Sequence, residues 1–192
     1  MISTRTLTRT ALFLALTLAI QLLRFPQPIT GPAINALLLL AALMIGPWPA
    51  VLIGCLTPGV ALLVGIIPPI VSPLVPFIML ANAILILVFY GISQAINPTR
   101  GSFYLSSQFR SGRRPAVALY SGIGLAALAK FGFLYLITQF AVQWFYQLGW
   151  IKAAIPSQAL LTFQLPQLYT ALVGGILAVT LYRYLLPQRY KR

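Results

Sequence analysis

Most of this chain consists of long apolar stretches, and no other feature limits its possible folds as strongly. About 20 apolar residues in a helix cross a bilayer whose hydrocarbon core is roughly 30 Å thick. Of the 192 residues, 60% are hydrophobic and only 7% are charged, whereas soluble domains carry about 25% charged residues. The composition therefore predicts an all-α membrane protein. The predicted membrane spans are 7–23, 33–45, 50–67, 76–96, 115–138 and 159–182.

The distribution of basic residues predicts the topology. Span 33–45 is short, because its thirteen residues reach only about 20 Å. Basic residues cluster before the first span, between the fourth and fifth spans, and after the last span, and cytoplasmic loops carry such an excess. An even number of crossings must separate these groups, so the short span is retained. We predict one domain over residues 1–192, a bundle of six transmembrane helices with both termini in the cytoplasm and an outer connector at 139–150.

The charged residues exclude most catalytic chemistry. The chain has 13 Lys and Arg residues but no Asp, Glu or His. Acid–base catalysis by carboxylates, Ser-His-Asp systems and most metal sites need the missing residue types. We therefore expect a protein that is not an enzyme, with no catalytic residues, no metal site and no cofactor.

The formal charge of +13 does not by itself indicate a nucleic-acid partner. A basic patch for nucleic acid needs a polar surface to carry it, and this chain offers little. The basic segment 100–114 is instead expected to touch anionic lipids. Docking of that segment to an acidic cytoplasmic protein is the alternative.

Lys130 lies well inside the fifth predicted span. It is fifteen residues beyond the start of that span, or roughly 22 Å along a helix. Placing an ammonium group in hydrocarbon costs at least about 2.5–3.5 kcal/mol, and no carboxylate side chain exists to pair with it. Two interpretations remain open: the side chain extends to the outer interface, or it binds an anionic or carbonyl ligand that enters from outside.

Other polar side chains concentrate in the predicted outer halves of the spans. Hydrogen bonding between helices can explain each amide taken singly. Their position on the same side as Lys130 suggests an outward-facing polar cavity that prefers neutral or anionic ligands. Aromatic residues near it can stack on a ligand ring. The candidate substrate-binding residues are Asn35, Asn82, Lys130, Gln139, Gln143, Trp144, Gln164 and Tyr169.

Two further patterns concern helix shape and packing. Ala11, Ala15 and Ala19 recur every four residues, and such small residues let another helix approach closely. By spacing alone, that helix can belong to this chain or to a partner. Pro58 is expected to kink the third span, either as ordinary helix shaping or with its freed carbonyl groups lining the cavity.

Several of these features together resemble a known family. Six short spans, the pattern Ala11-x-x-x-Ala15-x-x-x-Ala19 and the length of the chain are similar to the substrate-binding (S) component of energy-coupling factor (ECF) transporters. Segments 31–38, 45–47, 57–58 and 76–82 resemble an uncharacterised clade of that family.

The resemblance implies a multi-pass protein of the bacterial cell membrane that captures a vitamin-like micronutrient from outside and hands it inward. The implied partners are a transmembrane coupling subunit, which Ala11, Ala15 and Ala19 would contact, and two cytoplasmic ATPase subunits. The chain has no GxxxxGK[ST] phosphate loop, so it does not hydrolyse ATP by that route. The alternative, from a different class, is a structural scaffold protein of a cell-envelope membrane complex.

Overall fold

The computed structural model describes residues 3–67, 69–96, 113–150 and 157–189. All regular structure in these residues is helical, with six α-helices and one short 3-10 helix. The elements in chain order are α1 (Thr4–Leu22), α2 (Gln27–Met44), α3 (Pro47–Leu63), η1 (Pro69–Leu74), α4 (Val75–Ile96), α6 (Arg113–Gln147) and α7 (Ser157–Arg189).

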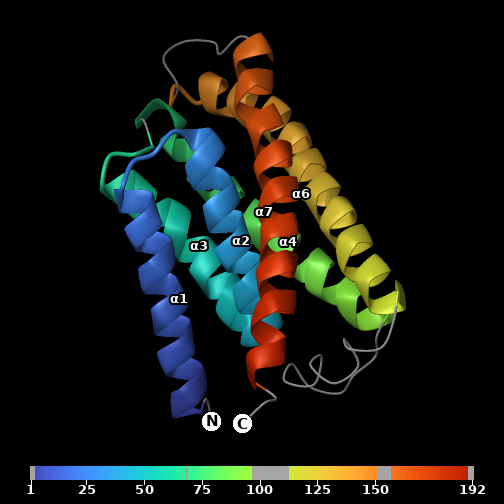
Figure 1. Ribbon diagram of the computed structural model, residues 1–192. Helices are drawn as coiled ribbons and strands as arrows, with labels where there is room; N and C mark the ends of the chain where they lie inside the picture. Colours follow the sequence, from blue (N-terminus) through green and yellow to red (C-terminus); the bar gives the residue numbers. More distant parts are fainter. Residues whose placement is uncertain (1–2, 68, 97–112, 151–156, 190–192) are drawn as a thin grey trace.

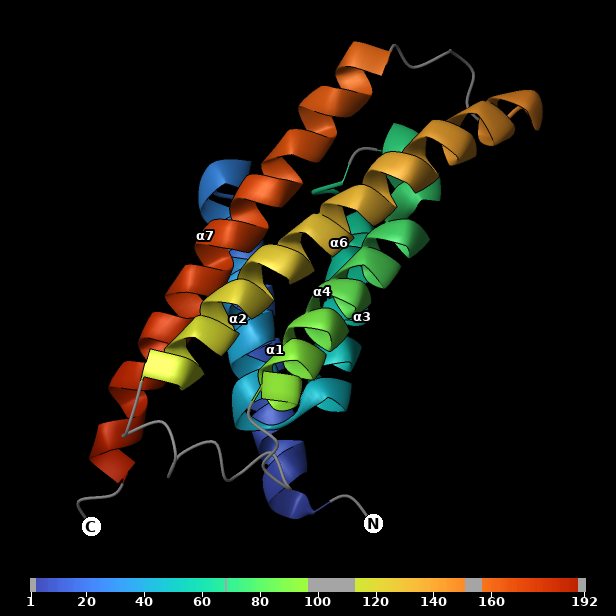
Figure 2. The same cartoon turned by 90° about the vertical axis from the view of Figure 1, so that its right-hand side faces the viewer.

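Helix α2 occupies the centre of the bundle. It packs against α1, α3, α4 and α7, while α4 also packs against α3 and α6, and α6 packs against α7 (Figures 1 and 2). Leu38, Leu39, Ala41 and Ala42 are fully buried in α2, so this helix is apolar and enclosed on most sides, as expected for a central helix. Helix α1 lies at the edge, on α2 and α3.

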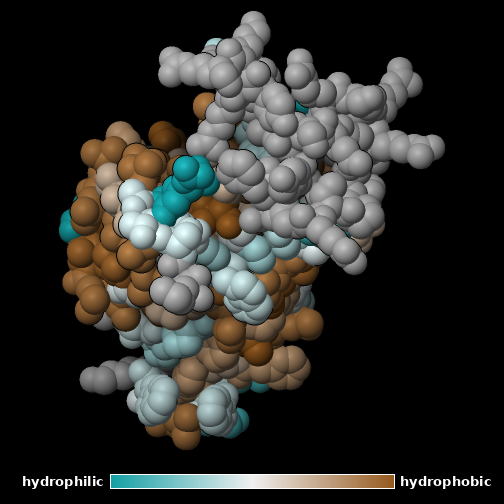
Figure 3. Space-filling view, turned by 90° about the horizontal axis from the view of Figure 1, so that it is seen from below, coloured by the Kyte–Doolittle hydropathy of each residue, from teal (hydrophilic) through white to brown (hydrophobic). Residues whose placement is uncertain are grey.

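The outer surface of the bundle is apolar. Large side chains such as Trp48, Leu63 and Phe140 are highly exposed, which in water would be a large unprotected patch. Viewed from the end at which α1 begins, the visible flank is mostly hydrophobic, and more hydrophilic residues gather on the end face (Figure 3). This distribution is that of a protein surrounded by lipid.

Four helical stretches are long and apolar enough to cross a bilayer. Helix α3 is also apolar but shorter. These features are those of an integral membrane protein, as the composition predicts. The four stretches are Gln27–Met44, Ser72–Ala95, Leu119–Gln147 and Leu165–Leu185.

The start of helix α2 differs from the predicted span. Helix α2 begins at Gln27 instead of residue 33, because Pro28 falls in the first turn, where a missing N–H costs nothing. It has 18 residues and is therefore longer than the sequence suggested.

Helix α6 continues to Gln147, so the prediction of a connector is wrong for residues 139–147. No Gly or Pro occurs between Gly132 and Gly149, which has φ +73°. There the N–H of Trp150 bonds to the carbonyl of Phe145 at 2.9 Å, and the N–H of Gly149 bonds to that of Tyr146 at 3.1 Å. This pair of bonds is the Schellman arrangement that ends a helix at a left-handed glycine.

Two glycines allow α2 and α7 to cross closely. A Cβ atom added to Gly174 of α7 would lie 2.6 Å from the carbonyl oxygen of Pro32 and 2.7 Å from Cβ of Asn35. A Cβ atom on Gly31 of α2 would lie 2.5 Å from Cγ2 of Thr170. The absence of side chains at these points therefore determines how near α7 comes to α2.

We expect Gly174→Ala to destabilise the protein by about 1–3 kcal/mol, because the added methyl group meets backbone atoms that cannot move aside. Gly132→Ala on α6 is the matched control, since nothing lies within 4 Å of its added Cβ. The control should be neutral or stabilising by up to about 1 kcal/mol. Thermal unfolding of both purified variants in detergent measures the difference, and equal melting temperatures would contradict the assigned crossing.

Candidate functional site

A cavity of about 230 Å³ lies within the bundle. Its wall includes Gln21, near the end of α1, and Gln27, at the start of α2, so it lies away from the start of α1. The start of α1 and the end of α7 lie at the same end of the bundle (Figure 1). All six α-helices, together with residues between α3 and η1, contribute to its wall. The lining residues are Gln21, Gln27, Thr30, Gly31, Ile34, Asn35, Thr57, Pro58, Ala61, Ile66, Ile67, Ile78, Asn82, Lys130, Gln167 and Thr170.

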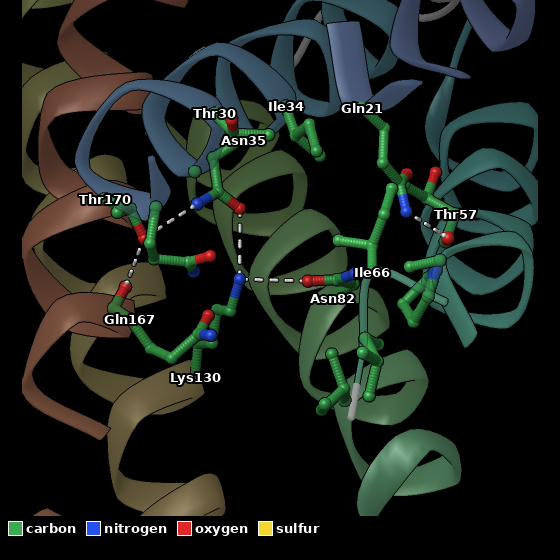
Figure 4. A pocket seen from close by; sticks show the side chains of 16 residues that line it. Gln21, Thr30, Ile34, Asn35, Thr57, Ile66, Asn82, Lys130, Gln167 and Thr170 are labelled. Carbon is green, nitrogen blue, oxygen red and sulfur yellow. Dashed lines mark hydrogen bonds between the residues drawn. The ribbon is translucent and has the colours of Figure 1, made fainter. Parts of the chain in front are cut away.

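Lys130 is the charged residue of this wall. Its side chain is only 2% exposed. Nζ donates hydrogen bonds to Oδ1 of Asn35 at 3.0 Å and to Oδ1 of Asn82 at 2.9 Å (Figure 4). The ammonium group is therefore held inside the bundle between α2 and α4, and it does not extend to the interface.

The lysine determines the orientation of both amides. An ammonium only donates hydrogen bonds, so each amide turns its oxygen toward Nζ and its NH₂ group away. Nδ2 of Asn35 donates to Oγ1 of Thr170 at 3.2 Å, and that hydroxyl donates to the carbonyl of Gln167 at 3.3 Å. The result is a directed chain of hydrogen bonds from α6 through α2 to α7.

The other amide is held by α3. Nδ2 of Asn82 donates to the carbonyl oxygen of Gly54 at 2.9 Å. Because Pro58 has no N–H, this carbonyl, four residues earlier, lacks its normal donor within the helix. Gly54 also leaves space for α4, since an added Cβ would lie 3.2 Å from Cβ of Asn82. The carbonyl that Pro58 frees thus positions the asparagine that binds Lys130.

Gln21 brings α1 into the same cavity. Nε2 of Gln21 donates to the carbonyl oxygen of Thr57 at 3.1 Å. Its Oε1 atom is buried and has no hydrogen-bond partner among the described residues. Such an unsatisfied acceptor is uncommon in a folded protein.

The structure brings together three of the predicted substrate-binding residues, Asn35, Asn82 and Lys130. Gln139 is half-buried, Gln143, Trp144 and Tyr169 are exposed, and none of these four lines the cavity. Gln164 belongs to α7, but its side chain lies outside the described part of the structure. A substrate role for these five remains a prediction.

Helical periodicity explains why these residues lie elsewhere. Gln139 comes nine residues after Lys130 in α6. At about 100° per residue, nine residues bring the helix to its opposite face, so Gln139 points away from Lys130. Trp144 is fourteen residues from Lys130, or roughly 21 Å along the axis. It instead stacks on Phe145, with ring centroids 5.7 Å apart, and Phe145 stacks on Trp150 at 5.4 Å. Tyr169 lies between the cavity residues Gln167 and Thr170 in the sequence, but its side chain is exposed on the surface of the bundle.

The predicted substrate-binding residues do not include Gln21, Thr57, Gln167 and Thr170, which also line the cavity. One signal was available for the first of these. Phe13, Thr17 and Gln21 recur every four residues and form the buried face of α1, and two polar residues on the buried face of a membrane helix indicate a polar contact inside the bundle. Thr57 and Gln167 contribute backbone carbonyls, which no sequence pattern identifies.

The alanine stripe lies on the other face of α1. Ala11, Ala15 and Ala19 are all exposed. The stripe therefore does not pack against the other described helices of this chain, which removes one of its two interpretations.

The arrangement can bind a small molecule but carries no acid–base pair. The described residues contain no cluster of three metal-ligating side chains, and the whole chain lacks carboxylate and imidazole side chains. What the cavity offers is one ammonium group, amide and hydroxyl groups, and an apolar wall that includes Ile34, Ile66 and Ile78. Such a combination of a few polar groups with apolar walls is typical of ligand pockets.

We expect Lys130 and Asn82 to be strongly coupled in stability. Asn82→Leu removes one acceptor from the buried ammonium and the donor from Gly54, so it should cost about 2–4 kcal/mol. In the double variant Lys130→Met/Asn82→Leu, the buried ammonium group is gone, so no buried charge lacks a hydrogen-bond acceptor. The double variant should therefore be more stable than the sum of the single effects predicts, by about 1–2 kcal/mol. Free energies of unfolding from SDS titration in mixed micelles test this, and strict additivity would contradict it.

Comparison with known proteins gives a family match for this sequence. The sequence matches the family described as "ECF transporter, substrate-specific component" over residues 5–186, which includes the cavity and nearly all of the six helices. No curated protein and no solved structure gave a significant match. Members of the matched family are substrate-binding subunits of membrane transporters and not enzymes. The chain therefore belongs to the family of substrate-specific components (S components) of ECF transporters.

Proposed function

We propose that this protein is the substrate-capture subunit of an ATP-driven ECF importer and that its substrate binds in the cavity beside Lys130. Family membership supports the coarser part of this statement, a membrane subunit that binds a small molecule and works with coupling and ATPase modules. The observation that carries the finer part is the buried ammonium group at the cavity wall. A scaffold role has no comparable support, because the matched family consists of transport subunits.

The proposed substrate is a vitamin-like micronutrient that is neutral or anionic. The volume of about 230 Å³ is below the roughly 300–1,000 Å³ of most small-molecule pockets, which favours a small substrate. A cationic substrate would be repelled by Lys130, and no carboxylate side chain exists in the chain to offset that repulsion.

The proposed topology has six crossings, with both termini in the cytoplasm and the cavity nearer the outside. It is supported by the positions of the charges: Arg5 and Arg9 lie in the first turns of α1, and Arg183 lies near the end of α7. These helix ends lie at the same end of the bundle (Figure 1), and an excess of Arg and Lys favours the cytoplasmic side. By the family resemblance, the membrane is a bacterial cell membrane. Anionic lipids are expected around the basic end.

The proposed partners are a transmembrane coupling subunit and two cytoplasmic ATPase subunits. The exposed stripe of Ala11, Ala15 and Ala19 on α1 supports a contact with the coupling subunit, because small side chains allow close helix packing in a membrane. We expect no nucleic-acid partner.

A bulky residue in the stripe should break the association with the partner while leaving ligand binding intact. Ala15→Trp fills the position where the partner helix is expected, so co-purification of the coupling subunit and ATPases in mild detergent should fall at least tenfold. Leu128→Trp is the matched control, since Leu128 is 56% exposed on α6, away from the stripe. Equal recovery of the partner subunits with both variants would refute the assigned interface.

The role of Lys130 can be tested by ligand binding. Native mass spectrometry of the detergent-purified protein should reveal a retained small molecule, and thermal shifts across a vitamin panel should identify compounds that bind. Lys130→Met should weaken binding of such a compound about tenfold to a hundredfold, since a hydrogen bond to a charged group contributes about 1.5–3 kcal/mol. Arg183→Met, at an exposed position near the end of α7, is the control. Full affinity in Lys130→Met would refute the proposed role.

A further inference from the structure

Two polar atoms at the cavity are left with bonding capacity that the described residues do not use. Lys130 has three N–H donors, and two of them go to Asn35 and Asn82. Gln21 has a buried Oε1 atom with no hydrogen-bond partner among the described residues. One atom is a donor on α6 and the other is an acceptor on α1, and both residues line the same cavity.

The neighbouring groups determine the polarity of Gln21. Its other amide atom lies 3.1 Å from the carbonyl oxygen of Thr57, and a carbonyl only accepts hydrogen bonds. The atom facing Thr57 must therefore be the nitrogen, so the unsatisfied atom is the oxygen. The hydroxyl of Thr57 cannot satisfy it, because Oγ1 donates its proton to the carbonyl of Ile53 at 2.7 Å.

Both amides around Lys130 already turn their oxygen atoms toward it. Nδ2 of Asn35 donates to Thr170 and Nδ2 of Asn82 donates to Gly54, so neither amide can rotate to offer more to the lysine without losing a partner. The chain has no carboxylate side chain at all. A bound molecule can supply an acceptor for the third N–H, and an anionic group placed there would balance the charge of Lys130.

We propose that the substrate is a small monocarboxylic acid that also carries an N–H donor away from its carboxylate. The carboxylate accepts from Nζ of Lys130, and the N–H donates to Oε1 of Gln21, with the apolar body of the molecule against Ile34, Ile66 and Ile78. This inference rests on the proposed function, because it takes the cavity as the substrate site.

A carboxylate fits the site better than a phosphate ester. Lys130 is the only Lys or Arg residue lining the cavity in the described part of the chain, and it has one N–H left to give. A phosphate ester carries up to two charges and three oxygens that need donors. A carboxylate carries one charge, which the single ammonium balances.

A molecule bound in this way connects α1 to α6. Gln21 lies on the buried face of α1, and the exposed stripe of Ala11, Ala15 and Ala19 lies on the other face. The same helix would thus contact the substrate on one side and the coupling subunit on the other.

The test is a matched set of compounds measured on matched variants. The acids are pyrrole-3-carboxylate, 6-oxopiperidine-3-carboxylate and indole-5-carboxylate, whose single N–H is at least two ring bonds from the carbon that carries the carboxylate. Each is compared with its primary carboxamide and with its N-methyl derivative. Phosphate esters and amines of similar size complete the panel. Dissociation constants are measured by calorimetry for the original protein and for Gln21→Met, Lys130→Met and the control Gln94→Met. Gln94 lies twelve residues beyond Asn82 on α4, away from the cavity.

We expect the acids with an N–H to bind most tightly, with at least a tenfold loss of affinity when the acid is converted to its carboxamide (the carboxamide penalty) or when its N–H is methylated (the N-methyl penalty). The N-methyl penalty should disappear in Gln21→Met, whereas the carboxamide penalty remains there. Conversely, Lys130→Met should abolish the carboxamide penalty but keep the N-methyl penalty. Gln94→Met should show both penalties in full. A purely structural role for Gln21 would lower affinity for all compounds alike and would not remove a penalty selectively.

An N-methyl penalty that persists in Gln21→Met overturns the proposal, as does binding of amines or phosphate esters in preference to acids. If no acid of the panel binds while the coupling subunit and ATPases still co-purify, the substrate class is wrong and the proposed function stands. If no acid of the panel binds, no small molecule is retained and no partner co-purifies, both the substrate class and the proposed function are refuted.

Discussion

The structure depends on one physical constraint, a buried ammonium group in a chain that has no carboxylate side chain to neutralise it. Taking such a group out of water is costly, so each neighbouring dipole must be oriented toward it. The amide oxygens of Asn35 and Asn82 meet this need, and their NH₂ groups are in turn bound by Thr170 and by the carbonyl of Gly54. Pro58 and Gly174 contribute indirectly, the first by freeing that carbonyl and the second by letting α7 approach α2.

The arrangement also explains how one small bundle can serve both a ligand and a partner. Helix α1 lies at the edge of the bundle, with Phe13, Thr17 and Gln21 turned inward and three alanines turned outward. Its inward face reaches the cavity, and its outward face is free for another helix. A bound molecule that contacts Gln21 would therefore act on the same element that the coupling subunit is proposed to contact.

Much of the fold could be predicted from composition and spacing, because a membrane protein must arrange its apolar residues in helices. The helix ends were harder to predict. Helix α2 begins before its predicted span because Pro28 fits the first turn of a helix. Helix α6 continues past one membrane thickness, the length at which the sequence predicts the end of a span. Among the candidate site residues, Asn35, Asn82 and Lys130 stood out as polar groups within apolar spans. Gln139 and Tyr169 failed to reach the cavity because helical rotation turns them to other faces.

The sequence by itself determined that the protein is an integral membrane bundle, that it carries one lysine deep in a span, and that nothing in the chain can neutralise that lysine. These conclusions need only residue types and their order, since lipid permits few alternatives to apolar helices. Only the tertiary structure decided where the lysine points and which amides accept its hydrogen bonds. It also decided that the side-chain oxygen of Gln21, which has no hydrogen-bond partner among the described residues, lies at the same cavity. Those facts depend on close approaches between helices far apart in sequence, such as the crossing of α2 and α7, and on backbone carbonyls that every residue type shares.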